Sequence, residues 1–202
     1  MLDKALGAGS DNVDYFGGNF VGGYTLQQAP DEFAALCLLL QRRPIVLYGE
    51  IGIASGGSLR FISEHVGFNE AIVIDDGKHA RAAEQQTNLA EFRKQLQLFT
   101  GDSHTIEAGR FLDNACIGRE FDAMFIDGDH TYAGLRQDVN MVLPYCQPST
   151  RIIFHDTIAV PDIGKLVDEL VINEGFKLHA HFAANEITEL KRTMGIAVCS
   201  IA

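Results

Sequence analysis

The sequence is short of basic residues and has no long apolar run. It contains 16 Lys and Arg residues against 27 Asp and Glu residues, a formal net charge of -11 at pH 7. Binding to nucleic acid phosphates needs an excess of Lys and Arg, so nucleic acid is not expected as the main partner. The longest apolar run, FAALCLLL at 33–40, is far too short to span a bilayer. We therefore expect a soluble cytoplasmic enzyme with neither nucleic acid nor membrane as its partner.

Cysteine pairs are also missing. The chain has 4 cysteines, Cys37, Cys116, Cys146 and Cys199, and no two of them form a C-x-x-C pair. The start, MLDKALGAGSDNVDYFGG, has neither the apolar h-region nor the cleavage-site pattern of a signal peptide. Both absences favour free, mostly buried thiols in a reducing compartment.

The length and composition fit one folded domain. With 202 residues and 47% hydrophobic residues, the chain can bury a substantial core, and it shows no repeat or low-complexity tract. We assign 1–202 to a single domain, with an N-terminal arm and helix over 1–43 and the core over 44–202. Pro30 and the acids after it are typical of a helix start, which predicts a helix from Pro30 to about Gln41. This apolar helix could cover the core or form the interface of a homodimer.

From 44 onward, apolar segments alternate with amphipathic ones. The apolar segments predict strands, and the amphipathic segments predict helices that cover both faces of a mostly parallel sheet. Two final strands follow one another without a helix, which predicts an antiparallel hairpin at one edge. The fold class is therefore α/β, a doubly wound, seven-stranded, Rossmann-like sheet. Strands are expected at 44–50, 71–75, 97–102, 121–127, 151–156, 176–182 and 194–201, and helices at 56–65, 79–97, 105–115, 131–146 and 161–175.

Each of the five parallel strands ends in an acidic residue. Ligands of such sheets bind beyond the carboxyl ends of the strands, so these ends indicate where a site lies. Carboxylates gathered on one rim favour a site that binds hydrogen-bond donors and cations. The residues at the five ends are Glu50; Asp75 and Asp76; Asp102; Asp127 and Asp129; and His155 and Asp156.

A glycine-rich turn, YGEIGIASGGSL at 48–59, joins the first strand to its helix. It is not a P-loop, because Ser58 stands where that motif needs lysine, and it does not supply G-x-G-x-x-G. The pattern that remains is acid-x-Gly-x-x-x-Gly, formed by Glu50, Gly52 and Gly56. A plain strand-to-helix turn without a ligand is the alternative interpretation.

Several segments in order resemble one enzyme family. VLYGEIGIASGGS, VIDD, FTGDS, FDAMFIDGDHTYAGLRQDV and IIFHDT together are similar to class I S-adenosylmethionine-dependent methyltransferases. Within that superfamily the I-D-G-D-H-x-Y segment followed by F-H-D-T resembles the group related to macrocin-type O-methyltransferases. The resemblance covers about residues 44 to 201.

The resemblance implies a set of cofactor-binding residues. Glu50 and Gly52 would lie near the methionine part of S-adenosylmethionine, with Gly56 in the same cofactor-binding turn, and Asp75 would accept hydrogen bonds from both ribose hydroxyls. Asp102 with Ser103 would face the adenine amino group, and the chemistry agrees, because an ionised carboxylate only accepts hydrogen bonds. Two departures from the family pattern are the Tyr48–Gly49 pair before the acid and CQPST at 146–150 in place of Lys-Pro-Gly-Gly.

Asp127 and Asp156 are expected at the ends of neighbouring strands. Two carboxylates suit a hard divalent cation such as Mg²⁺, and the resemblance places metal ligands at Asp127 and at the 155–156 pair. His155 stands where related enzymes have an acid, and imidazole suits Zn, Fe or Ni better than Mg²⁺. His155 is therefore a candidate ligand together with Asp127 and Asp156, or a side chain that packs away from the site.

His130 is the candidate general base. The resemblance supports this, since macrocin-type enzymes carry a histidine base at this position. The ordinary pKa of a histidine also lets it take a hydroxyl proton near neutral pH. The structural alternative is that Asp127 and Asp129 cap the helix that begins at Thr131 and that His130 is an ordinary loop residue. The remaining histidines receive no role: His65, His79, His104, His179 and His181.

The sequence thus predicts a methyltransferase that uses S-adenosylmethionine, with or without a divalent cation, to methylate a hydroxyl of a small-molecule acceptor. One alternative is a protein that keeps the fold and binds without turnover. Another is a metal-dependent hydrolase or lyase that uses the carboxylates without S-adenosylmethionine.

Overall fold

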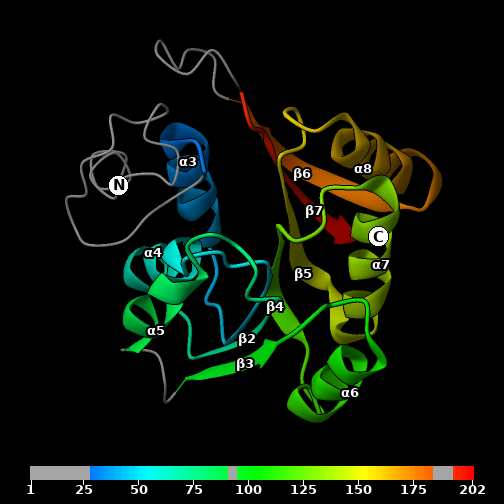
Figure 1. Cartoon of the computed structure of the whole chain (residues 1–202). Helices are drawn as coiled ribbons and strands as arrows, with labels where there is room; N and C mark the ends of the chain where they lie inside the picture. Colours follow the sequence, from blue (N-terminus) through cyan, green and yellow to red (C-terminus); the bar gives the residue numbers. More distant parts are fainter. Residues whose placement is uncertain (1–27, 91–94, 184–192) are drawn as a thin grey trace.

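The computed structural model describes residues 28–90, 95–183 and 193–202 of the chain. These residues form a seven-stranded sheet in the order β3-β2-β1-β4-β5-β7-β6, covered by helices on both faces (Figure 1). Strand β7 runs antiparallel to both β5 and β6, and the other neighbouring pairs are parallel. The predicted fold class and its antiparallel edge are confirmed. Of the N-terminal arm and helix predicted over 1–43, residues 1–27 lie outside the described residues.

The central strands are buried on both faces, as their continuous apolar sequences predict. In β1 all five residues are buried, and in β4 only Asp122 is partly exposed. Strand β5 begins five residues before the predicted start, because Cys146 already pairs with Phe121 ahead of a register shift. The strands are β1 (Leu47–Ile51), β2 (Glu70–Asp75), β3 (Leu96–Thr100), β4 (Phe121–Ile126), β5 (Cys146–His155), β6 (Phe176–Phe182) and β7 (Ile196–Ile201).

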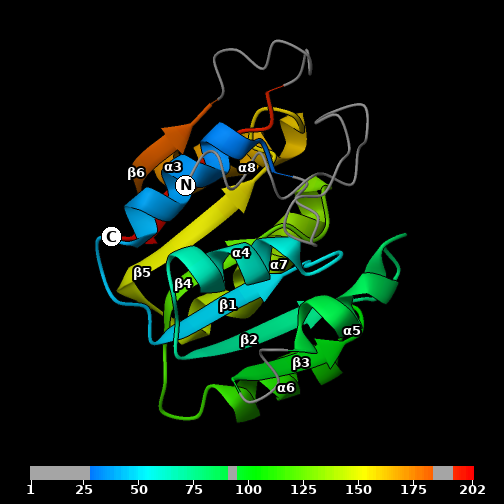
Figure 2. The ribbon, with the colours of Figure 1, turned by 90° about the vertical axis from the view of Figure 1, so that its left-hand side faces the viewer.

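Two helical layers enclose the sheet. The helices α3 (Pro30–Leu40), α4 (Gly57–His65), η1 (Ala82–Glu84) and α5 (Gln85–Asn88) lie on one face, and the view turned by 90° shows α3 and α4 in front of the strands (Figure 2). The other face carries α6 (Ile106–Ala115), α7 (Tyr132–Val142), η3 (Leu143–Tyr145) and α8 (Pro161–Asn173). Each layer has its own apolar core against the sheet. No helix in the described part of the chain is long and apolar enough to cross a bilayer.

The prediction of a long amphipathic helix over 79–97 is wrong. In the described residues this segment forms the short elements η1 and α5, with a turn at Leu89, and β3 already begins at Leu96. The side chains of Gln85 and Asn88 donate hydrogen bonds to the carbonyl oxygens of Ala54 and Ser55, at 2.6 and 2.8 Å. These polar side chains tie the segment to the glycine turn, so its polarity does not mark the solvent face of a long helix.

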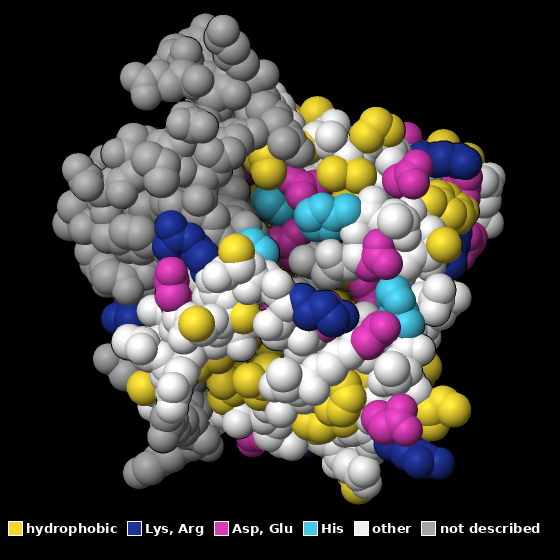
Figure 3. Space-filling model, viewed as in Figure 1, with side chains coloured by type: hydrophobic (Ala, Val, Ile, Leu, Met, Phe, Trp, Pro, Cys, Tyr) yellow, Lys and Arg dark blue, Asp and Glu magenta, His cyan; other side chains and the backbone are white. Residues whose placement is uncertain are grey.

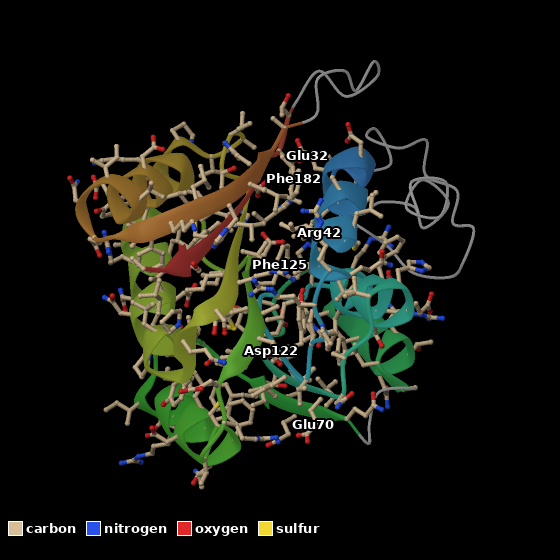
Figure 4. The ribbon with its side chains drawn as sticks, turned by 180° about the vertical axis from the view of Figure 1, so that it is seen from behind. Glu32, Arg42, Glu70, Asp122, Phe125 and Phe182 are labelled. Atoms are coloured by element: carbon tan, nitrogen blue, oxygen red, sulfur yellow. The ribbon has the colours of Figure 1, made fainter. Side chains whose placement is uncertain are left out.

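Helix α3 is held close to the carboxyl ends of the strands. Phe33 of α3 packs against Phe125 of β4, with ring centroids 6.3 Å apart. Glu32 is buried, and its Oε2 accepts a hydrogen bond from the backbone N–H of Gly195 at 2.9 Å. Figure 4 shows Glu32 between α3 and the β5-β7-β6 edge, close to Phe182. These contacts bring the residues just before α3 to the rim where a ligand is expected.

Candidate functional site

A cavity of about 800 Å³ opens at the carboxyl ends of β1, β2, β4 and β5. Its volume is in the range of small-molecule sites. Acidic and histidine side chains gather around a hollow on this face of the molecule (Figure 3). Most predicted site residues line the cavity, but Glu50 and Gly56 do not. The lining includes Gln28, Gly52, Asp75, Asp102, Ser103, His104, Asp127, His130, His155 and Asp156.

The glycine turn is shaped by the end of β4. Gly52 has φ +80°, and a Cβ there would lie 2.2 Å from the carbonyl oxygen of Asp127, so no larger residue fits. Gly56 has φ +84° and directly precedes α4, with its N–H bonded to the carbonyl oxygen of Ile53 at 2.6 Å. The turn is therefore pressed against the strand end that carries Asp127.

Glu50 lies behind the turn rather than in the cavity. It is fully buried, and its carboxylate accepts hydrogen bonds from Tyr48 Oη at 3.0 Å and from the hydroxyl of Ser58. Burial raises the pKa of Glu50 to about 8, although both hydrogen bonds oppose the shift. Glu50 thus links β1 to the first turn of α4, and Tyr48, one of the two departures from the family pattern, supplies one of its donors.

Asp75 is already fully hydrogen-bonded within the protein. Its Oδ2 accepts from the backbone N–H groups of Ile53 and Ala54, at 2.8 and 3.2 Å. Its Oδ1 accepts from the N–H of Gly77 and from Gln85 Nε2, both at 2.8 Å. A carboxylate has about four lone-pair sites, so a ligand hydroxyl must displace one of these donors. Gln85 is the side-chain donor among them and can rotate away.

Asp102 and Ser103 stand at the far end of the cavity. The Asp102 side chain is 57% exposed, and its Oδ1 accepts a hydrogen bond from the backbone N–H of His104 at 2.8 Å. Ser103 Oγ donates to Asp138 Oδ1 at 2.6 Å. The sequence interpretation gave no role to Asp138, a buried residue of α7, although it lies within the segment FDAMFIDGDHTYAGLRQDV.

The structure brings Asp127, His130 and Asp156 together. His130 Nε2 lies 3.4 Å from Asp127 Oδ1, and its Nδ1 lies 3.6 Å from Asp156 Oδ2. One donor atom from each of the three residues falls within 4.8 Å of the others, which is a spacing that can hold a metal ion. Asp156 has φ +59°, an uncommon conformation for a residue with a side chain, and Asp tolerates it better than most. This backbone turn directs the carboxylate at the end of β5.

His155 faces the same carboxylates from the protein interior. Its ring is only 2% exposed, and Nδ1 lies 3.1 Å from Asp127 Oδ1 and 3.5 Å from Asp156 Oδ1. Burial lowers the pKa of His155, but the negative charges of Asp127 and Asp156 outweigh this and raise it to about 9. Near neutral pH the ring is therefore a cation that donates to Asp127. Of the two histidines, His130 is the one placed with Asp127 and Asp156 in the group that can hold a metal.

The charges of Asp127 and His130 depend on each other. Burial raises the pKa of Asp127, but the charge of His155 and the hydrogen bond from His130 prevail, and its pKa falls below the ordinary value. The hydrogen bond to Asp127 raises the pKa of His130, against a smaller opposing effect of burial. Asp127 is thus ionised over the whole physiological range, and His130 is a stronger base than a free imidazole.

The helix-capping alternative holds in part for Asp129 but not for Asp127. Thr131 is the N-cap of α7, and its Oγ1 accepts from the N–H of Gly134 at 3.0 Å. Asp129 Oδ1 accepts from the N–H of Thr131 at 2.8 Å and shapes the turn before the helix. Asp127 takes no part in this cap and faces the cavity.

Gln28 is a site residue that the sequence did not reveal. Its Nε2 donates to Asp127 Oδ2 at 3.1 Å, across 99 positions of the chain. The residue is 3% exposed, and its Oε1 has no hydrogen-bond partner in the structure as described. It lies two positions before Pro30, outside every recognisable motif.

A comparison with protein families gives one match. The model of a methyltransferase domain matches residues 50–157, which is more than half of the chain. The match spans the glycine turn and the strand ends that carry Asp75, Asp102, Asp127 and Asp156. A search of curated proteins gave no match.

Several solved structures share the fold. An O-methyltransferase from Bacillus cereus in complex with SAH aligns with a TM-score of 0.67 and 17% identity, over 100% of this chain and 90% of its own. The O-methyltransferase TomG from Streptomyces achromogenes, in complex with SAM, aligns with a TM-score of 0.69 and 15% identity, over 100% and 89%. The N-methyltransferase NodS from Bradyrhizobium japonicum aligns with a TM-score of 0.63 and 13% identity, over 99% and 96%. At these identities the likeness concerns the fold.

Proposed function

The chain belongs to the methyltransferase domain family, and from this membership we propose that it transfers the methyl group of S-adenosylmethionine to a hydroxyl oxygen of a small-molecule acceptor. The observation that carries the proposal is the arrangement of one cavity with two ends. One end presents the acceptor groups of Asp75, Asp102 and Ser103, and the other presents Asp127, His130 and Asp156.

The first end fits the nucleoside part of the cofactor. The ribose hydroxyls and the adenine amino group are hydrogen-bond donors, and the side chains at this end are hydrogen-bond acceptors. In the proposal, Asp75 accepts from the ribose after Gln85 moves aside, and Asp102 and Ser103 accept from the amino group. Gly52 lets the turn pack against the end of β4, and in the proposal a ligand contacts the turn where it lines the cavity. S-adenosylmethionine supplies a methyl group on a positively charged sulfur, which is already activated for transfer.

Glu50 and Gly56 contribute indirectly in this proposal. Neither lines the cavity, but Glu50 fixes Ser58 and Gly56 shapes the start of α4. Both therefore set the conformation of the turn whose Gly52 faces the ligand.

The second end fits a hydroxyl group and its proton. The His130 side chain is 46% exposed, so an acceptor can reach its ring from the cavity. In the proposal, neutral His130 takes the hydroxyl proton as the oxygen attacks the methyl group, and the adjacent carboxylates stabilise the imidazolium that forms. The residues of both ends act mainly by holding the two reactants in line.

The donor set also fits a divalent cation such as Mg²⁺, which prefers carboxylate oxygens. Asp127 and Asp156 are the residues that would hold it, with His130 beside them and His155 behind. A bound cation would lower the pKa of an acceptor hydroxyl that it contacts. The charge of His155 cancels part of the negative charge of Asp127, so we expect weaker metal binding than two unpaired carboxylates would give.

The test has two stages. Binding of S-adenosylhomocysteine is measured by isothermal titration calorimetry, and transfer of a labelled methyl group from S-adenosylmethionine is then assayed against a panel of hydroxylated compounds. Micromolar binding and turnover of at least one hydroxylated compound support the proposal. Absence of binding would refute the cofactor assignment. Binding without transfer to any compound would favour a binding protein without turnover.

A further inference from the structure

Asp138 is a buried carboxylate that the proposed reaction does not use. It lies on α7 and is 0% exposed. Its Oδ1 accepts a hydrogen bond from the hydroxyl of Ser103 at 2.6 Å and lies 3.1 Å from His104 Nε2. Burial raises the pKa of Asp138, against the hydrogen bond from Ser103 and the charge of His104. Burying a carboxylate is costly, and packing of the helix does not require one. The hydrogen-bond donors around Asp138 therefore indicate that its carboxylate has a specific role.

The bond to Asp138 decides what Ser103 presents to the cavity. A hydroxyl has one proton to donate and two lone pairs that accept. Because the proton of Ser103 points to Asp138, only its acceptor lone pairs remain available to a ligand in the cavity that Ser103 lines. Without Asp138 the hydroxyl could rotate and donate to a ligand instead.

His104 connects the same carboxylate to Asp102. Nε2 of the His104 ring lies 3.1 Å from Asp138 Oδ1, and Nδ1 lies 3.7 Å from Asp102 Oδ1. The backbone N–H of His104 also donates to Asp102 Oδ1 at 2.8 Å. Asp138 therefore stands behind both Ser103 and His104, and the latter orients Asp102.

Asp138 also supports the loop that follows β4. A Cβ at Gly128 would lie 3.1 Å from Asp138 Oδ2, so the backbone of this loop packs directly on the carboxylate. Ser103 and Gly128 thus lie near different oxygens of one carboxylate, and both line the cavity. The carboxylate therefore lies next to both the loop after β3 and the loop that carries His130.

We propose that Asp138 is a positioning residue that makes this end of the cavity selective for a 6-aminopurine over a 6-oxopurine. The inference rests on the proposed function, since it takes the nucleoside of S-adenosylmethionine as the ligand at this end. Asp102 and Ser103 then meet the purine only with acceptors, which bind an amino group and repel a carbonyl oxygen. Asp138 holds Ser103 in that state and, through His104, holds Asp102 in place.

The test compares two ligands that differ at one position of the purine. The dissociation constants of S-adenosylhomocysteine and S-inosylhomocysteine are measured for the full-length chain, and the wild type is expected to prefer the adenosyl compound by about tenfold or more. Asp138→Ala is expected to lower this preference severalfold, mainly by weakening binding of the adenosyl compound. Asp138→Asn, which keeps a carbonyl oxygen for Ser103, is expected to retain more of it.

A double-mutant cycle separates positioning from simple structural support. If Asp138 acts through Ser103, then Ser103→Ala lowers the preference by a similar factor, and the double variant Ser103→Ala/Asp138→Ala loses less than the product of the two factors. Asp113→Ala is the matched control, because Asp113 is a helical carboxylate that accepts from Tyr145 Oη and lies outside the cavity lining. It is expected to leave both constants unchanged.

The possible results are distinct. Equal weakening of both ligands in Asp138→Ala, or an unchanged preference, overturns the positioning role while leaving the proposed function intact. Failure of the wild type to bind S-adenosylhomocysteine refutes the cofactor and this inference together. If Asp138→Ala does not fold, the single variants Asp138→Asn and Ser103→Ala take its place in the test. An unchanged preference for the adenosyl compound in both of them overturns the proposal.

Discussion

Gln28 and Asp127 are joined by a hydrogen bond from Nε2 to Oδ2 at 3.1 Å, although 99 positions separate them in the chain. The bond ties the segment before α3 to the centre of the candidate site. With His155 on Oδ1 and Gln28 on Oδ2, both oxygens of Asp127 are held in place. The segment before α3 thereby helps to fix the orientation of the Asp127 carboxylate in the cavity.

Gln28→Leu is expected to impair methyl transfer more than cofactor binding. Removing a hydrogen bond to a charged group costs about 1.5–3 kcal/mol, so kcat/KM for an acceptor found in the panel should fall about tenfold or more. The dissociation constant for S-adenosylhomocysteine should change little. Gln41→Leu serves as the control, because Gln41 bonds to the carbonyl oxygen of His65 on the surface. Equal kinetics for wild type and Gln28→Leu would show that the contact has no role in catalysis.

Asp75→Ala is expected to weaken binding of S-adenosylhomocysteine by about 1.5–3 kcal/mol for each ribose bond that is lost. Gln85→Ala should not weaken it, because in the proposal Gln85 must leave Asp75 before the ribose binds. Calorimetric titration of the three proteins distinguishes these outcomes. An unchanged constant in Asp75→Ala, or a large loss in Gln85→Ala, would contradict the ribose assignment.

Glu50 is expected to make the protein less stable as the pH rises. Its pKa is raised in the folded state to about 8 from an ordinary value of 4.5, so between these values the folded state binds more protons than the unfolded state. The contribution of Glu50 to the free energy of unfolding is therefore full below about pH 4.5 and is lost as the pH rises through about 8. Urea unfolding of wild type and Glu50→Gln from pH 5 to 9 measures the effect.

His155 must be separated from this profile. Its pKa is also raised, to about 9 from 6.5, so its contribution is full below about 6.5 and is lost as the pH rises through about 9. The difference between wild type and Glu50→Gln isolates Glu50, because His155 is present in both. Parallel profiles for the two proteins would mean that Glu50 titrates normally.

His130→Ala is expected to keep cofactor binding and to slow methyl transfer by about 10²–10⁴, the usual contribution of a general base. Because the pKa of His130 is raised, the acidic limb of the wild-type pH–rate profile should lie above the ordinary value of 6.5. That limb should disappear in the variant. His179→Ala is the control, since His179 bonds to Ser200 and lies outside the cavity lining. An acidic limb that persists in His130→Ala would assign the base to another group.

A divalent cation is expected to stabilise the protein if Asp127 and Asp156 bind it. Mg²⁺ or Mn²⁺ should raise the melting temperature, EDTA should reverse the rise, and a hundredfold excess over Kd corresponds to about 2.7 kcal/mol. Asp127→Asn should reduce the response while the fold persists, and Asp113→Asn should leave it intact. If neither cation shifts the melting temperature of the wild type, methyl transfer would have to depend on His130 and the carboxylates alone.

The sequence by itself determined the sheet and the edge at which the site lies. Alternating apolar and amphipathic segments allow only a covered, mostly parallel sheet, and parallel strands place all their carboxyl ends on the same rim. The positions of Asp75, Asp102, Asp127 and Asp156 at that rim follow directly. The free state predicted for the four cysteines is likewise found in the structure.

The tertiary structure decided which of these side chains face the cavity. Glu50 shares a strand face with Tyr48 and turns into the core, because alternate residues of a strand point the same way. Both His130 and His155 lie near the two carboxylates, but His130 is the one whose ring joins them in the group that can hold a metal. Gln28 reaches the site from the segment before α3, 99 positions from Asp127, and Asp138 reaches it from the second turn of α7. A motif records spacing along the chain, whereas these contacts depend on how separate elements pack, so only the folded structure could show them.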